Sequence, residues 1–214
     1  MSIRHIPVQV RNKGGVGVML NVGNQKVIAI GASTGGVDAL EKVLMRLPVS
    51  IPPIVIAIHM AVGMTKLFSD RLDDLLRVNV KEAQTGDILT QGQVLIAPAG
   101  KHMKVVSRMG KLVVECFSGL KINHVIPSID VLFESIAPLK GKNAVGVILT
   151  GIGADGAKGL LTMRTQGATT IGQDEKTSVV YGMPKVAMEI GAVQHQLPIN
   201  MIADKILLCS SGGL

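Results

Sequence analysis

The chain has 214 residues, enough for one sizeable domain, and 47% of them are hydrophobic although only 2% are aromatic. No apolar run approaches the roughly 18 residues of a membrane span, and the N-terminus lacks a signal-peptide pattern, so we expect a cytoplasmic protein without membrane insertion. The formal net charge of +7 admits acidic partners. The basic residues are scattered, however, and few aromatic side chains could stack on bases, which argues against nucleic acid as a partner.

The first part of the chain differs from the rest. Residues 1–26 are basic, glycine-rich and weakly patterned, and we interpret them as an N-terminal arm or linker remnant, with a minor contribution as an edge strand. Residues 27–214 follow a strand–helix rhythm and form one domain in our interpretation. Cys116 and Cys209 have no metal or redox spacing, and we expect two small buried side chains in a reducing compartment. No group of side chains has metal-ligand spacing, so we expect neither metal nor cofactor.

Short apolar runs alternate with amphipathic stretches along this domain, which predicts buried parallel strands joined by helices. The predicted strands are Val27 to Ile30, Ile54 to Ile58, Val78 to Ala83, Val94 to Ala97, Val145 to Leu149, Thr169 to Ile171 and Ala192 to Leu197. The predicted helices are Val37 to Leu47, Thr65 to Leu76, one capped by Ser128, one from Gly156 to Arg164, one after Pro184 and Pro198 to Leu208. Near the middle, Met103 to Val106 and Leu112 to Cys116 flank a Met-Gly turn and predict an antiparallel hairpin. The fold class is therefore α/β, with a doubly wound, mostly parallel, Rossmann-like sheet flanked by helices.

The first predicted strand leads into Gly31-Ala32-Ser33-Thr34-Gly35, a G-x-S-x-G segment followed by a helix. Strand, tight turn and helix are the context in which a nucleophile elbow presents its serine hydroxyl. A glycine-rich turn between strand and helix is also used for dinucleotide binding, and Ser33 could be no more than the cap of its helix. This segment alone does not decide between these interpretations.

Two other polar residues stand at strand ends that a doubly wound sheet brings to the same edge. His59 directly follows the second strand, and Asp155 lies in the glycine-rich loop after Val145 to Leu149. With Ser33 they supply the nucleophile, base and orienting carboxylate of an acyl-transfer triad. His59 could instead be a structural histidine and Asp155 a helix cap. His195 would complete the chain order of an α/β-hydrolase, but it lies within a predicted strand and ranks below His59.

A rival interpretation is a short-chain dehydrogenase, because Tyr181 and Lys185 form a Y-x-x-x-K pair. That pair must share one continuous helix, which Gly182 and Pro184 disfavour. The second strand also ends in His59 rather than in the acidic residue that would bind an adenosine ribose. A non-catalytic binding module is a third interpretation.

The sequence resembles the catalytic domain of the chemotaxis-receptor protein-glutamate methylesterases, the CheB family, over most of its length. The resemblance is carried by six ordered segments: IGASTGG at Ile30 to Gly36, the strand ending in His59-Met60, IAPAGKHM at Ile96 to Met103, PSIDVLF at Pro127 to Phe133, ILTGIGADGAKGL at Ile148 to Leu160, and Gln173 to Pro184.

This resemblance implies a serine hydrolase that removes γ-methyl esters from glutamates on receptor signalling helices, releases methanol, and in many members also deamidates glutamines. It implies Ser33 as nucleophile, His59 as base and Asp155 as orienting carboxylate. Thr34 and the backbone around Ile152 and Gly153 would line the substrate and oxyanion region.

The chain departs from the usual family pattern at four positions, which are Val37, Ile58, Ile126 and Ile152 in place of Pro, Gln, Arg and Met. We interpret the first two as packing changes, and expect the last two to alter substrate fit more than triad chemistry. Residues 1–26 are too few for the phosphorylatable receiver domain that usually precedes this domain. The chain is then either an excised catalytic domain or a standalone esterase, and the sequence leaves both open.

Overall fold

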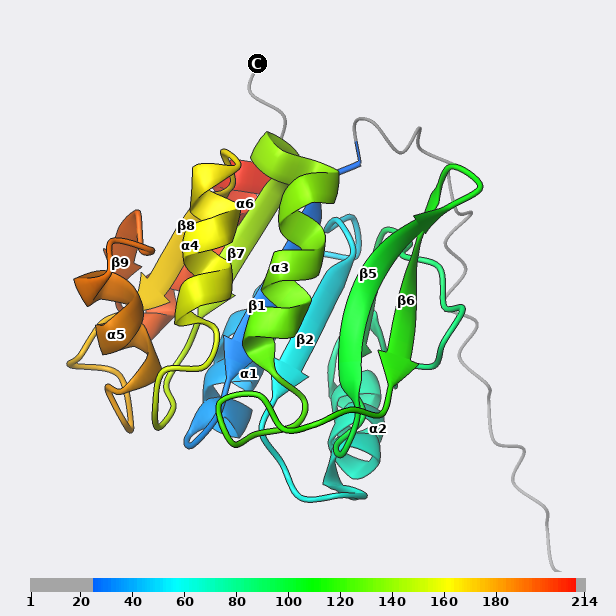
Figure 1. Cartoon of the computed structure of the whole chain (residues 1–214), viewed down its shortest axis with the longest axis horizontal. Coiled ribbons are helices and arrows are strands. Elements are labelled where there is room, and N and C mark those ends of the chain that lie inside the picture. Colours follow the sequence, from blue (N-terminus) through cyan, green and yellow to red (C-terminus); the bar gives the residue numbers. More distant parts are fainter. Residues whose placement is uncertain (1–24, 211–214) are drawn as a thin grey trace, which may run out of the picture.

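A parallel sheet forms the centre of the fold in the computed structural model, which describes residues 25–210 (Figure 1). The predicted N-terminal arm, apart from Gln25 and Lys26, lies outside the described residues. The sheet has seven strands in the order β3-β4-β2-β1-β7-β8-β9, and every neighbouring pair is parallel. Its strands are β1 (Val27–Ala32), β2 (Ile54–Ile58), β3 (Asn79–Glu82), β4 (Gln93–Ile96), β7 (Ala144–Ile148), β8 (Thr169–Gln173) and β9 (His195–Leu197).

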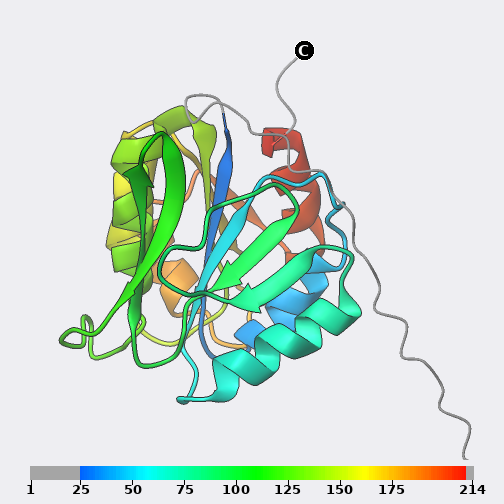
Figure 2. The same ribbon diagram turned by 90° about the vertical axis from the view of Figure 1, so that its right-hand side faces the viewer.

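Helices cover both faces of the sheet, as Figure 2 shows when the sheet is seen between its two layers. The helices are α1 (Gly36–Leu44), α2 (Met64–Leu75), α3 (Ile129–Lys140), α4 (Ala157–Thr165), α5 (Met183–Glu189) and α6 (Ile199–Ser210), and a 3₁₀ turn, η1, spans Gly141–Asn143. Side chains of α1, α2 and α6 share one apolar cluster with one face of the sheet, and those of α3, α4 and α5 share a second cluster with the opposite face. The central strands are therefore buried on both sides, which is why they are apolar throughout.

The two faces differ in side-chain size. On β1 and β2, the isoleucines Ile28, Ile30, Ile54 and Ile56 point toward α1, α2 and α6. The alternate positions, Val27, Ala29, Val55 and Ala57, are smaller and point toward α3. The backbone of α3 can therefore approach β1 closely.

A separate two-stranded antiparallel sheet, β5 (His102–Arg108) with β6 (Lys111–Phe117), confirms the predicted hairpin. It stands beside α3 in both views, and its apolar residues join the cluster under α3 (Figures 1 and 2). The amide of Val105 donates to the Ser135 hydroxyl of α3 at 2.9 Å. The hairpin thus extends the layer of α3, α4 and α5 past the edge of those helices.

The predicted fold class is confirmed, and the differences lie at the element ends. Strand β1 continues to Ala32, and α1 ends at Leu44 rather than at Leu47. Strand β9 spans only His195–Leu197, whereas we predicted it from Ala192. Helix α5 begins at Met183 with Pro184 in its first turn, whereas we predicted a helix after Pro184. The N–H groups in the first turn of a helix have no acceptor within the helix. A proline, which has no N–H, is therefore tolerated there.

The chain order reverses next to β1, which has β2 on one side and β7 on the other. Register pairs Ala32 with Ile58 and Gly31 with Ile148. The loops that follow these three strands therefore leave the same edge of the sheet side by side, at the place where open α/β sheets bind ligands. Among residues 25–210, no helix is long and apolar enough to cross a membrane.

The packing of α3 yields a stability prediction. Phe133 is fully buried between the sheet and α4, so Phe133→Ala would leave a cavity. We expect the free energy of unfolding to fall by about 3–5 kcal/mol, measured by urea denaturation. Met109→Ala at the fully exposed hairpin turn is the control, with an expected change within about 0.5 kcal/mol. Equal losses for the two variants would contradict the prediction.

Candidate active site

Ser33 is the first residue after β1, and its backbone is held on both sides. Its amide donates to the Thr150 carbonyl at 3.0 Å, and its own carbonyl accepts from the Gly36 amide at 2.7 Å. The N-cap of α1 is Gly35, in the left-handed region at φ 79°, and no side chain caps this helix. The alternative interpretation of Ser33 as the helix cap is therefore wrong, and its half-buried side chain is left for another role.

His59 occupies the equivalent position after β2. Because Ala32 pairs with Ile58, Ser33 and His59 each lie one step beyond the last pair of two adjacent parallel strands. The amide of His59 donates to the Ala32 carbonyl at 3.2 Å, which continues the ladder past the strand end. Its imidazole is 14% exposed, and its Nε2 lies 3.0 Å from Oδ2 of Asp155. The structure thus brings together two of the predicted triad residues in direct contact and the third at the neighbouring strand end.

Asp155 is 2% exposed and accepts hydrogen bonds on both carboxylate oxygens. Oδ2 accepts from His59 and, at 2.6 Å, from the amide of Ile129 at the start of α3. Oδ1 accepts from Asn123 Nδ2 at 2.9 Å and from Ser128 Oγ at 2.8 Å. Asp155 therefore does not cap α4, whose N-cap Gly156 has no side-chain cap bond. It binds the first turn of α3 instead.

The charge state of Asp155 follows from these contacts. Burial by itself raises the pKa of the Asp155 carboxyl, but the hydrogen bonds from its neighbours, His59 first among them, outweigh burial and hold that pKa below its usual range. An ionised carboxylate can only accept, so the bond requires a hydrogen on His59 Nε2. In the neutral ring, Nδ1 is then the basic nitrogen. This is the reverse of the more usual triad, in which Nδ1 faces the carboxylate.

The loop after β7 closes the other side of Ser33. A Cβ added at Gly151 would lie 2.6 Å from Cβ of Ser33 and 2.4 Å from the sulfur of Met183, so a side chain there would collide with both. The Thr150 hydroxyl donates to the Thr34 carbonyl at 2.9 Å and accepts from the Val180 amide at 2.9 Å. These contacts fix the loop against the turn that carries Ser33.

The residues predicted for the oxyanion region lie around this turn. Thr34 is exposed directly after Ser33, and Ile152 is 65% exposed directly after Gly151. Gly153 follows with a φ of 88°. Their roles stay predictions.

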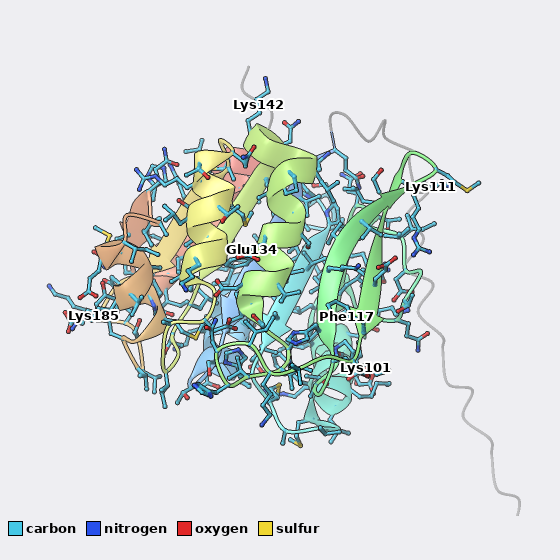
Figure 3. The ribbon with its side chains drawn as sticks, in the orientation of Figure 1. Lys101, Lys111, Phe117, Glu134, Lys142 and Lys185 are labelled. Atoms are coloured by element: carbon cyan, nitrogen blue, oxygen red, sulfur yellow. The ribbon has the colours of Figure 1, made fainter. Side chains whose placement is uncertain are left out.

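A cleft of about 460 Å³ opens beside His59. One wall belongs to the segment after β2, and the other to the segment before α3. Its lining residues are His59, Met60, Ala61, Val62, Gly100, Lys121, His124, Val125 and Ile126. None of these is a carboxylate. Figure 3 shows Lys101, the neighbour of Gly100, at the end of the molecule where the parallel strands finish, whereas Lys111 lies at the far end of the hairpin.

The remaining sequence candidates lie elsewhere. His195 is on β9, the edge strand, separated from β1 by two strands. Tyr181 precedes α5, and Lys185 lies within α5 beside Glu189, at the outer side of the molecule (Figure 3). Tyr181 and Lys185 therefore do not share a helix, as the sequence predicts, and the geometry of a dehydrogenase pair is missing.

Sequence reasoning missed three residues that surround Asp155, namely Asn123, Ser128 and Asp130. Ser128 was assigned only as a helix cap, a role it also has, since its hydroxyl accepts from the Val131 amide. His102, at the start of β5, is buried and supports this segment: its Nδ1 accepts from the Ser128 amide at 3.1 Å, and its Nε2 donates to the Leu120 carbonyl at 2.9 Å. The motif around Ser128 was a signal for these contacts, but no local pattern marks Asn123.

The packing at Gly151 yields a second prediction. Gly151→Ala should displace Ser33 or the loop and lower the free energy of unfolding by about 1–3 kcal/mol, because Cβ of Ser33 is attached directly to the backbone and cannot move away without the turn, even if the Met183 side chain adjusts. Gly119→Ala is the control, since its Cβ would come no closer than 3.3 Å to a side-chain atom and should cost less. Thermal unfolding of both variants measures the difference, and equal stability would contradict it.

A third prediction concerns pH. The folded-state pKa of Asp155 is lowered, so its stabilisation is present above the ordinary carboxyl pKa of about 3.9 and is lost as pH falls through the lower folded value. The difference in unfolding free energy between wild type and Asp155→Asn should therefore be larger at pH 7 than at pH 3. Urea denaturation at both pH values measures it. Asp74→Asn, at an exposed position of α2, controls for the substitution itself, and a difference for Asp155→Asn that does not change with pH would refute the prediction.

The chain is similar to several known proteins. A protein-glutamate methylesterase/protein-glutamine glutaminase of Syntrophomonas wolfei is 51% identical over 180 residues, which are 84% of this chain and 53% of that protein. The protein of the same name from Sulfurimonas denitrificans is 52% identical over 181 residues, 85% of this chain and 51% of that protein. The chain thus spans about half the length of the curated relatives it matches.

The crystal structure of the Thermotoga maritima CheB methylesterase catalytic domain superimposes with a TM-score of 0.83 at 38% identity, covering 86% of this chain and 97% of that one. The sequence profile of the CheB methylesterase family matches residues 28–206. The chain therefore belongs to the CheB methylesterase family.

Proposed function

We propose that residues 27–214 form the catalytic domain of a protein-glutamate methylesterase that acts in the cytoplasm. It hydrolyses γ-methyl esters of glutamate on the signalling helices of chemotaxis receptors, releases methanol, and deamidates receptor glutamines. The observation that carries this proposal is the bond between His59 and the buried Asp155 carboxylate, at the strand end next to Ser33. The names of the relatives support the same activity.

In the first half of the reaction, the Ser33 hydroxyl oxygen attacks the ester carbonyl carbon while Nδ1 of His59 takes its proton. The ionised Asp155 stabilises the imidazolium through Nε2. When the tetrahedral intermediate collapses, the bond to the methoxy oxygen breaks and His59 returns the proton to that oxygen, so methanol leaves. The glutamyl group is then an ester of Ser33.

In the second half, His59 takes a proton from water as the water oxygen attacks the acyl carbonyl. Collapse breaks the bond to Ser33, whose oxygen recovers the proton, and a glutamate is released. With a glutamine substrate the leaving group of the first half is ammonia. The backbone N–H groups around Thr34, Ile152 and Gly153 would stabilise the oxyanion in both halves, because Thr34 directly precedes the N-cap of α1 and Ile152 lies in a glycine-rich loop.

The surroundings of Ser33 suit a protein surface better than a small molecule. Four strongly exposed apolar side chains come from four different segments at this edge of the sheet: Val62 at 80%, Leu120 at 89%, Ile152 at 65% and Val179 at 68% exposure. Exposed apolar groups gathered around a polar site are typical of protein-binding surfaces. The cleft adds Lys121 and His124 without a carboxylate among its lining residues, which favours an acidic partner such as a glutamate-bearing helix.

The test is methanol release from methylated receptor by wild type, Ser33→Ala and His59→Gln. Both variants should lose at least about 10³-fold in rate, because each removes a member of the proposed triad. Lys185→Met is the control and should retain the wild-type rate, since the Lys185 side chain lies at the outer side of the molecule beside Glu189 (Figure 3). Equal rates for all four proteins would contradict the mechanism. Receptor binding without methanol release would favour a binding module, and tight NAD(P) binding a dehydrogenase.

A further inference from the structure

One side-chain amide joins two buried carboxylates next to the proposed triad. Nδ2 of Asn123 donates to Oδ1 of Asp155 at 2.9 Å and to Oδ2 of Asp130 at 2.8 Å. Asp155 belongs to the loop after β7 and Asp130 to the first turn of α3, and they are 2% and 5% exposed. Both hydrogens of the amide are therefore used, each by a carboxylate from a different element.

Two carboxylates this close and this buried need a donor between them. Burial raises the pKa of the Asp130 carboxyl above its usual range, the hydrogen bond from the Gly159 amide at 2.7 Å opposes this, and the nearby charge of Asp155 raises the pKa further. A neutral amide supplies two hydrogens without adding a charge. A hydroxyl could satisfy only one of the two carboxylates as a donor.

The contacts of Asn123 also determine which oxygen of Asp155 meets His59. Asn123 and Ser128 occupy Oδ1, which leaves Oδ2 for His59 and the Ile129 amide. A carboxylate held at one oxygen by two donors cannot rotate without breaking them. The orientation of the His59 imidazole therefore depends on Asn123 indirectly, through Asp155.

The backbone at this position explains why the residue is an asparagine. Ile122 and Val125 exchange two hydrogen bonds, of 3.1 and 3.0 Å, around a two-residue turn. Both turn residues have positive φ, 52° at Asn123 and 67° at His124. Asn, Asp and Gly are the residues that tolerate such a turn, and Asn alone of the three has an amide donor.

We propose that Asn123 is a positioning residue of this active site: its amide holds Asp155 in the rotamer that orients His59, with Asp130 as the anchor that fixes the amide. The inference rests on the proposed esterase function for its kinetic readout. It also has a readout that does not depend on activity, the resonance of the hydrogen-bonded proton on His59 Nε2.

Two substitutions test the proposal and both fit the turn. Asn123→Gly removes the amide, and Asn123→Asp replaces it with a third carboxylate. Asn79→Gly, at the exposed start of the edge strand β3, is the matched control for an asparagine-to-glycine change. Each protein is assayed for kcat and KM with methylated receptor across pH, for thermal stability, and for the His59 Nε2 proton by NMR.

For Asn123→Gly, kcat should fall about 10-fold or more with KM within about 2-fold, and the His59 proton signal should broaden or move. For Asn123→Asp, the acid limb of the pH–rate profile should move to higher pH, because added negative charge favours the imidazolium form. The other titratable groups of this region are Asp130 and Glu134 of α3, Lys158 of α4, His102 of β5, and Lys121 and His124 of the segment before α3. Of these, Asp130 is bonded to the Asn123 amide, so a change in its protonation accompanies either substitution. Asn79→Gly should leave kcat, KM and the pH profile unchanged.

The measurements distinguish failure of the positioning proposal from failure of the proposed function. Folded Asn123 variants with wild-type kcat, pH profile and His59 signal would overturn the proposal, as would losses that follow thermal stability alone. If Asn123→Gly fails to fold, Asn123→Asp decides, because it retains the side-chain shape and in its protonated form donates to one of the two carboxylates. If wild type releases no methanol, the proposed function fails, and the His59 signal in the variants still tests positioning.

Discussion

The buried charge of Asp155 is the constraint on which the rest of the site depends. An isolated carboxylate in an apolar interior is strongly unfavourable, so donors must surround it. They come from three parts of the chain: the imidazole of His59, the first turn of α3 at Ile129, and the segment before α3 at Asn123 and Ser128. Each donor that stabilises the negative charge of Asp155 also fixes the position of one of its carboxylate oxygens. Stabilising the charge and orienting the imidazole are therefore achieved by the same hydrogen bonds.

The approach of α3 to Asp155 begins in the sequence of β1. A Cβ at Gly31 would lie 2.3 Å from Cγ2 of Ile129, and a Cβ at Gly156 would lie 2.5 Å from the same atom. Both glycines therefore leave room for the Ile129 side chain, and the amide of that residue reaches Asp155. The small residues Val27 and Ala29 continue this face along the strand. Gly31 of the G-x-S-x-G segment thus has a packing role, separate from the sharp turn in which Ser33 stands.

The sequence alone predicted the features that depend on the periodicity of apolar residues and on where the parallel strands end. Continuous apolar runs predicted the parallel strands, alternation predicted the hairpin, and the rule that parallel strands end at one edge predicted that His59 and Asp155 would be near Ser33. It was not sufficient where the partner is distant in sequence. Asn123 and Asp155 are 32 residues apart, and their contact follows from the path of a segment without regular structure. Ser33 looked like a cap because the sequence does not show that Gly35 takes the left-handed conformation at the helix start.

The segment between β6 and α3 connects the cleft to the predicted triad. Lys121 and His124 line the cleft, whereas Asn123 between them turns its amide inward to Asp155. His102 fixes the segment by bonding Leu120 at one end and Ser128 at the other. Ile126, where the family usually has an arginine, lies on the cleft side of the same segment. Because the inward contacts use other residues, this wall can differ in charge and shape between relatives while the carboxylate stays in place. We therefore expect variation at Ile126 to act on the fit of the proposed substrate, and the chemistry proposed at Ser33 to keep its own, separate support.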